Sequence, residues 1–193
     1  MSTVFLASES PVRLQLLQSV GIEPVVCASE ISEHPTKGEL PRKYVERLAL
    51  EKAITASKNI ENGYIIGAHT AVTLGRRILP KATSDALVKS CLTIISGRRH
   101  TVYTGLYVIR KTASNLSESR SRIVSSIVRF KSLTIAEIEF YVQSKEGIGR
   151  HGGYSLGGRI ESFIPFISGS TSNIAGIPMV EFKNLMTSLG YSF

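Results

Sequence analysis

The chain of 193 residues has no tryptophan, only two cysteines and no long apolar run. Cys27 and Cys91 form no CxxC pair and have no histidines clustered at zinc-binding spacing, so we expect free thiols without redox or zinc chemistry. No stretch approaches the roughly 20 apolar residues that cross a bilayer, and the first residues show no basic segment followed by an apolar run. We therefore expect a cytoplasmic protein without a membrane partner, in which residues 1–193 form one domain.

Several common catalytic motifs are also missing. The sequence contains no GxxxxGK(S/T), no GxGxxG and no GxSxG, which disfavours the common nucleotide-hydrolase and esterase sites. Lys and Arg (23) exceed Asp and Glu (15), but the excess is spread along the chain without a block of like charge. This balance favours a polyanionic partner, nucleotide or nucleic acid. Aromatic residues make up 7% and form no RNP-like cluster, so nucleic acid is the less favoured of the two.

The sequence does contain apolar runs that alternate with residues typical of helix starts and ends. The run TVFLAS at 3–8 predicts a buried strand, and Ser10 with Pro11 predicts a helix that Gly21 closes. Further helices are expected at about 42–58, 83–96, 134–144 and from Pro178 to Gly190, and strands at 23–28, 100–111, 122–131 and 160–167, with polar loops at 112–121 and 168–176. Interleaved helices together with hairpins predict an α/β fold with a mixed twisted sheet.

Lys52 interrupts the apolar stripe of the helix predicted at 42–58. At 100° per residue it falls in the middle of the face formed by Val45, Leu48, Ala49 and Ala56. Its stem could pack on the core while the ammonium reaches solvent. Alternatively, this face of the helix looks into a cleft that holds anions.

Other basic residues stand at positions where a cleft is expected. Arg13 lies in the first turn of a helix, where main-chain N–H groups favour phosphate. Lys81 in LPKA and Arg150 in GRHGG follow short turns. Each alone is typical of a solvated surface, but together they resemble a polyphosphate clamp. Acids that could hold a divalent ion are fewer: Glu33, and Glu51, for which an ion pair with Arg47 one turn away is the alternative.

His69 is a single histidine in the apolar, β-branched run YIIGAHTAVTLG at 64–75. Taken alone, this pattern is typical of a packed core side chain.

In combination, these segments resemble the Maf family of nucleoside triphosphate pyrophosphatases, from FLASESPVR near the start to LMTSLG near the end. The motifs include LASESPVRLQLL against LAS-x-SPRR-x-x-LL, GAHTAV against GADTVV, ILPKA, GGYSLGG against G(A/G)Y-x-IQG, and ISGSTSNIAGIP against GSYSNVVGLP. The resemblance implies two lobes of an α/β fold around a cleft, similar to inosine triphosphate pyrophosphatases, and frequently a homodimer. The implied reaction is metal-assisted hydrolysis of a nucleoside triphosphate to the monophosphate and pyrophosphate, with Mg or Mn as the cofactor.

The resemblance also implies roles for residues. Glu33 would serve metal or water, Lys52 and Lys81 would act in catalysis, and the other matched positions would bind substrate: Ser8, Ser10, Arg13, Thr70 and Arg150. Positioning and charge neutralisation are most of what such a hydrolysis requires.

This chain also departs from the family pattern. His69 replaces the aspartate of GAD, which the family uses as proton acceptor, and Ser32 replaces the aspartate of IDE. Val12 and Gly157 replace an arginine and a glutamine that, with Thr70, are associated with dTTP and UTP in one branch.

The change at His69 leaves two functions open. An imidazole can accept a proton, but neighbouring cations lower its pKa, and Mg²⁺ prefers oxygen ligands whereas manganese, cobalt or zinc accept imidazole. The sequence is therefore compatible with a pyrophosphatase of reduced or altered activity and with a nucleotide-binding protein that has lost turnover.

Overall fold

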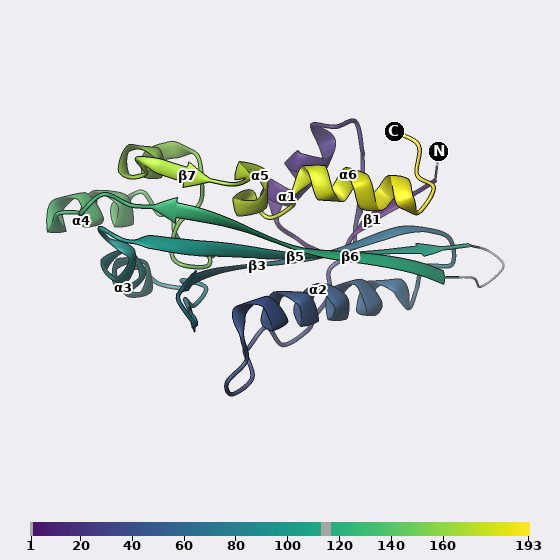
Figure 1. Cartoon of the computed structure of the whole chain (residues 1–193), viewed down its shortest axis with the longest axis horizontal. Helices are drawn as coiled ribbons and strands as arrows, with labels where there is room; N and C mark the ends of the chain where they lie inside the picture. Colours follow the sequence, from purple (N-terminus) through teal and green to yellow (C-terminus); the bar gives the residue numbers. More distant parts are fainter. Residues whose placement is uncertain (1, 113–116) are drawn as a thin grey trace.

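A mixed seven-stranded sheet forms the centre of the molecule (Figure 1). The computed structural model describes residues 2–112 and 117–193. Six strands follow the order β2-β1-β3-β5-β6-β7, and β4 pairs with β3 off this path. β1 pairs with β2 and β3 in parallel, and all other pairs are antiparallel. The strands are β1 (Val4–Leu6), β2 (Val25–Val26), β3 (Gly63–Leu74), β4 (Arg77–Ile78), β5 (Arg99–Lys111), β6 (Ser117–Arg129) and β7 (Phe166–Ser168).

Helices cover both faces of the three long strands β3, β5 and β6 (Figure 1). In that view α2 lies on one face, and α1, α5 and α6 lie on the other. The predicted mixed α/β fold is thereby confirmed. The helices are α1 (Pro11–Gln18), α2 (Pro41–Ser57), α3 (Asp85–Ile95), α4 (Ile135–Gln143), α5 (Thr171–Ala175) and α6 (Met179–Ser188), with a 3-10 helix η1 (Gly158–Phe163).

Helix α2 sits unusually close to the sheet because two glycines face it. A Cβ atom at Gly67 of β3 would lie 2.2 Å from the Ala49 carbonyl oxygen, and one at Gly105 of β5 would lie 2.2 Å from that of Val45. Val45, Leu48 and Ala49 are consequently buried against the strands. The close approach fixes the height of α2, and hence of Lys52, over the sheet.

Separate apolar clusters occupy the two ends of the sheet. Leu79, Leu92, Phe130 and Tyr141 belong to one around α3 and α4, whereas Leu6, Leu17, Leu106, Phe182 and Met186 belong to another under α1 and α6. Cys91 is buried in the first cluster and Cys27 is partly exposed, and both thiols are free as expected.

The structure corrects three sequence-based boundaries. The apolar run 160–167 is not one strand: its first half is η1, and β7 covers only Phe166–Ser168. Polar residues predicted to lie in the loop 112–121 belong partly to β6, which begins at Ser117; residues 113–116 lie outside the described part. The loop predicted at 168–176 contains α5.

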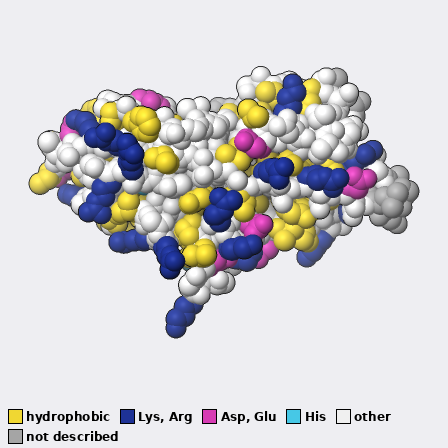
Figure 2. Space-filling view, viewed as in Figure 1, with side chains coloured by type: hydrophobic (Ala, Val, Ile, Leu, Met, Phe, Trp, Pro, Cys, Tyr) yellow, Lys and Arg dark blue, Asp and Glu magenta, His cyan; other side chains and the backbone are white. Residues whose placement is uncertain are grey.

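Basic side chains are visible over much of the face shown in Figure 2. Lys and Arg side chains lie among apolar and acidic ones, and several are close together at the left end of that view. In the described part of the chain, no helix has both the length and the apolar character that a membrane span needs.

Candidate active site

The nine positions that the motifs and the family resemblance mark as site residues all line one cavity of about 570 Å³. They converge from the N-terminus of α1, the loop before α2, α2 itself, the middle of β3, the segment after β4 and the loop after α4. These residues are Ser8, Ser10, Arg13, Glu33, Lys52, His69, Thr70, Lys81 and Arg150. The structure therefore brings together segments far apart in the sequence, although a shared location does not by itself assign a role to each residue.

Lys52 points into the cavity and pairs with Glu33. The Lys52 Nζ atom lies 2.5 Å from Oε1 of Glu33, and Lys52 is only 7% exposed. Burial alone would raise the pKa of Glu33, but the hydrogen bond and charge of Lys52, helped by His151 and Lys81, lower it overall. Of the two interpretations of Lys52, the structure supports the one in which its helix face looks into a cleft. Glu51 instead pairs with Arg47 on the helix surface.

Arg13 ties the start of α1 to the sheet. Its Nη1 donates to Ser8 Oγ (2.9 Å), its Nη2 to Thr70 Oγ1 (3.2 Å) and its Nε to the Gly176 carbonyl (3.1 Å). Burial lowers the pKa of Arg13 to about 10, with Glu33 opposing this effect, so the group remains a cation at neutral pH. Three of five N–H donors are used within the protein, which leaves two for an anion.

Ser10 has a structural role as well as a place in the cavity. Its hydroxyl accepts from the Arg13 backbone N–H (3.5 Å), which caps α1 as its position before Pro11 predicts. The cap holds the helix N-terminus beside the cavity, where its free N–H groups favour an anion.

His69 is both buried and part of the cavity. It is 2% exposed, its ring meets Tyr44 edge-on with centroids 5.0 Å apart, and its Nδ1 lies 3.9 Å from Glu33 Oε1. Burial first, and then the charges of His151, Arg13 and other basic neighbours, hold the pKa of His69 well below its usual range. The ring is therefore neutral at pH 7, as the basic neighbours led us to expect, although burial is the larger cause.

His151 is a cavity residue that the sequence reasoning missed. Its backbone bridges to Lys81, and its ring centroid lies 5.0 Å from that of His69. Burial lowers its pKa to about 4. Gly152, at φ 69°, lets the loop approach Val72 of β3 so closely that a Cβ would lie 2.7 Å from that side chain. The pair of adjacent glycines in RHGG was the available signal, because it marks a close backbone approach.

A divalent metal ion fits this set of side chains. Glu33, His69 and His151 each offer a ligand atom, and these atoms lie within 4.8 Å of one another. The Nε2 of His69 and the Nδ1 of His151 are buried without a hydrogen-bond partner among the described residues. Since buried polar atoms are normally satisfied, two unpartnered nitrogens beside a carboxylate are consistent with a cation ligated there.

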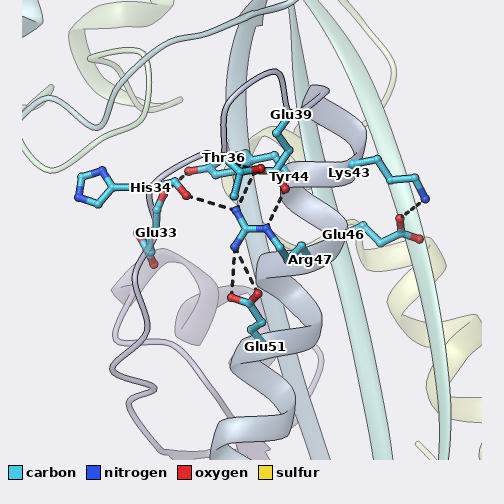
Figure 3. A network of polar contacts seen from close by, with 9 residues as sticks. All are labelled: Glu33, His34, Thr36, Glu39, Lys43, Tyr44, Glu46, Arg47 and Glu51. Carbon is cyan, nitrogen blue, oxygen red and sulfur yellow. Dashed lines mark hydrogen bonds and ion pairs between the residues drawn. The ribbon is translucent and has the colours of Figure 1, made fainter.

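The loop that carries Glu33 is anchored on α2 (Figure 3). Tyr44 Oη donates to the Glu33 carbonyl (2.8 Å), and Arg47 Nη2 donates to the His34 carbonyl (3.3 Å). Arg47 also binds Glu39 through Nε (2.7 Å) and Nη2 (2.8 Å). Figure 3 shows the Glu33 side chain directed away from this network. Arg47 thus holds the loop without binding the Glu33 carboxylate, which faces the cavity and Lys52.

Replacing Arg47 with methionine should misplace Glu33 without removing any cavity group. We expect kcat of a reaction that depends on Glu33 to fall about 10- to 100-fold because the loop loses three charge-assisted contacts, with a smaller change in KM. Steady-state kinetics check this, and Arg47→Lys should recover part of kcat. The exposed Arg42 of the same helix offers the control Arg42→Met, which should leave both constants unchanged. Equal kcat in wild type and Arg47→Met contradicts the positioning role.

The fold and the cavity together define an α/β protein with a basic pocket in which the Glu33 carboxylate pairs with Lys52, suited to a phosphorylated ligand. The family model described as "Maf-like protein" matches residues 3–189, and the chain belongs to this family. This confirms the resemblance seen in its motifs.

Named relatives extend the comparison. The "Nucleoside triphosphate pyrophosphatase" of Rickettsia felis is 47% identical over 97% of this chain and 93% of its own length. The protein of the same name from Orientia tsutsugamushi is 44% identical over 97% and 92%. Among solved structures, a HAM1 protein from Coxiella burnetii is 16% identical, covers 97% of this chain and all of its own, and has a TM-score of 0.49.

Proposed function

We propose that this chain is a nucleoside triphosphate pyrophosphatase, hydrolysing a ribo- or deoxyribonucleoside triphosphate to the monophosphate and pyrophosphate. The observation that carries the proposal is the pairing of buried Lys52 with partly exposed Glu33 in a cavity that also holds Lys81, Arg13 and Arg150. The names of relatives 47% and 44% identical support it.

Four cations and the Glu33 carboxylate suit the two halves of the reaction. Lys52, Lys81, Arg13 and Arg150 neutralise the triphosphate and the charge that develops on departing pyrophosphate. Glu33, whose lowered pKa keeps it ionised, orients the attacking water and accepts its proton. When bound, a divalent ion supplies further neutralisation at the phosphates and makes water more acidic.

Neutral His69 offsets none of the surrounding positive charge, unlike an aspartate at that position. The family resemblance assigns proton acceptance to an aspartate at this position, a role left here to Glu33, and loss of one general base typically reduces a rate by about 10²–10⁴-fold. We therefore propose reduced or altered activity, with magnesium-dependent turnover the most affected. The same observation favours a second candidate function, a nucleotide-binding protein without turnover.

The three positions that the resemblance associates with base preference do not all line the cavity. Thr70 lines the cavity, whereas Val12 and Gly157 lie outside its lining. Gly157 has φ 89°, a conformation that a glutamine would adopt only with strain. The proposal includes dTTP and UTP as candidate substrates, on the retained threonine and the family resemblance. A homodimer and a cytoplasmic location are part of the same proposal.

The test is pyrophosphate release from a panel of triphosphates, with Mg²⁺ and Mn²⁺ compared, in wild type and His69→Asp. We expect turnover in the wild type to favour Mn²⁺, and His69→Asp to raise the magnesium-dependent rate. No turnover by the wild type with any metal, together with calorimetric binding of a non-hydrolysable triphosphate, would establish the second function instead.

A further inference from the structure

Glu33, His69 and His151 form an unusual donor set for a phosphate-handling pocket. The three come from separate segments: the loop before α2, the middle of β3 and the loop after α4. All three line the cavity, so a metal held there would lie beside Lys52 and Lys81. Two of the three donors are imidazole nitrogens and only one is a carboxylate oxygen.

The separations match a mononuclear site before ligation. The three ligand atoms lie within 4.8 Å of one another. Even if all three separations had that value, one point would lie about 2.8 Å from each atom, against roughly 2.0–2.2 Å in bound sites. Inward shifts of about 0.7 Å per side chain would bring the three donors to bonding distance.

Ring packing alone does not account for these histidines. His69 contacts Tyr44 and His151 edge-on, yet these contacts leave its Nε2 and the Nδ1 of His151 without hydrogen-bond partners. His100, outside the cavity, also leaves its Nδ1 unpartnered, but its Nε2 lies 2.7 Å from Tyr154 Oη, whereas among the described residues no side-chain hydrogen bond involves the ring of His69 or His151. Ligation would satisfy nitrogen lone pairs that packing leaves unused.

We infer that Glu33, His69 and His151 bind a single transition-metal ion of the kind that accepts imidazole, such as zinc, cobalt or manganese, in preference to magnesium. Magnesium retains water and selects oxygen donors, which only Glu33 provides within this set of three side chains. Imidazole nitrogens favour the later first-row divalent ions. In this arrangement His69 is a ligand and not the base. The inference deepens the proposed function, on which its catalytic consequence rests.

Metal binding without nucleotide provides the test. Titration calorimetry with Zn²⁺, Co²⁺, Mn²⁺ and Mg²⁺ should show Zn²⁺ and Co²⁺ binding at least about tenfold more tightly than Mg²⁺, with one ion per chain. His151→Ala should weaken Zn²⁺ binding at least about tenfold. His69→Asp, which exchanges a nitrogen donor for oxygen, should reduce the preference for Zn²⁺ over Mg²⁺. Co²⁺ should develop intense visible absorption that His151→Ala abolishes.

His34 supplies the matched control. It is adjacent to Glu33 in sequence, but its side chain is exposed and points away from the network in Figure 3. His34→Ala should leave Zn²⁺ affinity unchanged, and thermal melting of each variant shows that it is folded. Equal Zn²⁺ affinity in wild type, His151→Ala and His151→Gln overturns the inference, as does Mg²⁺ binding as tight as Zn²⁺.

These measurements separate the metal site from the reaction. Selective Zn²⁺ or Co²⁺ binding in a protein without turnover supports the site and contradicts the proposed function. Magnesium-dependent turnover without selective Zn²⁺ or Co²⁺ binding supports the function and contradicts the site.

Discussion

Replacing Lys52 with methionine is expected to reduce pyrophosphate release about 10²–10³-fold, the usual cost of removing one preorganised group that stabilises developing charge. The substitution preserves most of the apolar stem but removes the ammonium paired with Glu33 at 2.5 Å. Since Lys52 supplies the main influences that lower the pKa of Glu33, that pKa should rise at the same time. Steady-state kinetics at saturating metal measure the effect.

Lys43 on the same helix is the matched control for Lys52. Its side chain is 73% exposed and pairs with Glu46 at the surface. Lys43→Met should change the rate less than about twofold, because exposed ion pairs contribute little. If Lys52→Met retains a rate comparable to that of Lys43→Met, the Lys52–Glu33 pair has no part in the reaction.

The largest expected effect on stability comes from Gly67→Ala. The new Cβ would lie 2.2 Å from the Ala49 carbonyl oxygen and 2.8 Å from the Ala53 backbone nitrogen, so helix α2 has to move off the sheet. We expect the free energy of unfolding to fall by about 3 kcal/mol or more, at or beyond the upper end for overpacked cores. Urea denaturation measures this loss. Gly105→Ala, which meets the Val45 carbonyl at 2.2 Å, should behave similarly.

An open glycine at the end of β3 serves as the control for this prediction. Gly75 has φ 59° and no atom within 4 Å of an added Cβ. Gly75→Asn should reduce the free energy of unfolding by less than about 1 kcal/mol, because asparagine tolerates the left-handed region. An unfolding midpoint for Gly67→Ala equal to that for Gly75→Asn would falsify the close-packing account of α2.

The sequence predicts the fold best where side-chain pattern and local signals agree. Ser10 and Pro11 correctly mark the start of α1, and Thr134 with Glu137 forms a capping box where the helix predicted from residue 134 begins. The run at 160–167 was misread because Ile160 and Phe163 are buried at three-residue spacing, which is the period of the 3-10 helix observed there. β6 extends into polar sequence because its backbone hydrogen-bonds to that of β5. This pairing does not require the exposed side chains of β6 to be apolar.

The cavity was predictable only in part. Lys52 stood out because a lysine in an apolar stripe conflicts with its neighbours, and the motifs drew attention to Arg13, Lys81 and Arg150. For His151 the paired glycines that follow it signalled only that the backbone approaches another segment closely. Its proximity to His69 depends on the loop after α4 folding back to bridge with Lys81, a long-range contact whose partner no local pattern specifies.

The most direct test of the proposed activity is the identity of the products. Purified chain, incubated with a triphosphate and Mn²⁺, should release nucleoside monophosphate and pyrophosphate in equal amounts, as resolved by phosphorus NMR, and Lys52→Met should suppress both. Release of nucleoside diphosphate with inorganic phosphate, or equal pyrophosphate release by wild type and Lys52→Met, would contradict the account.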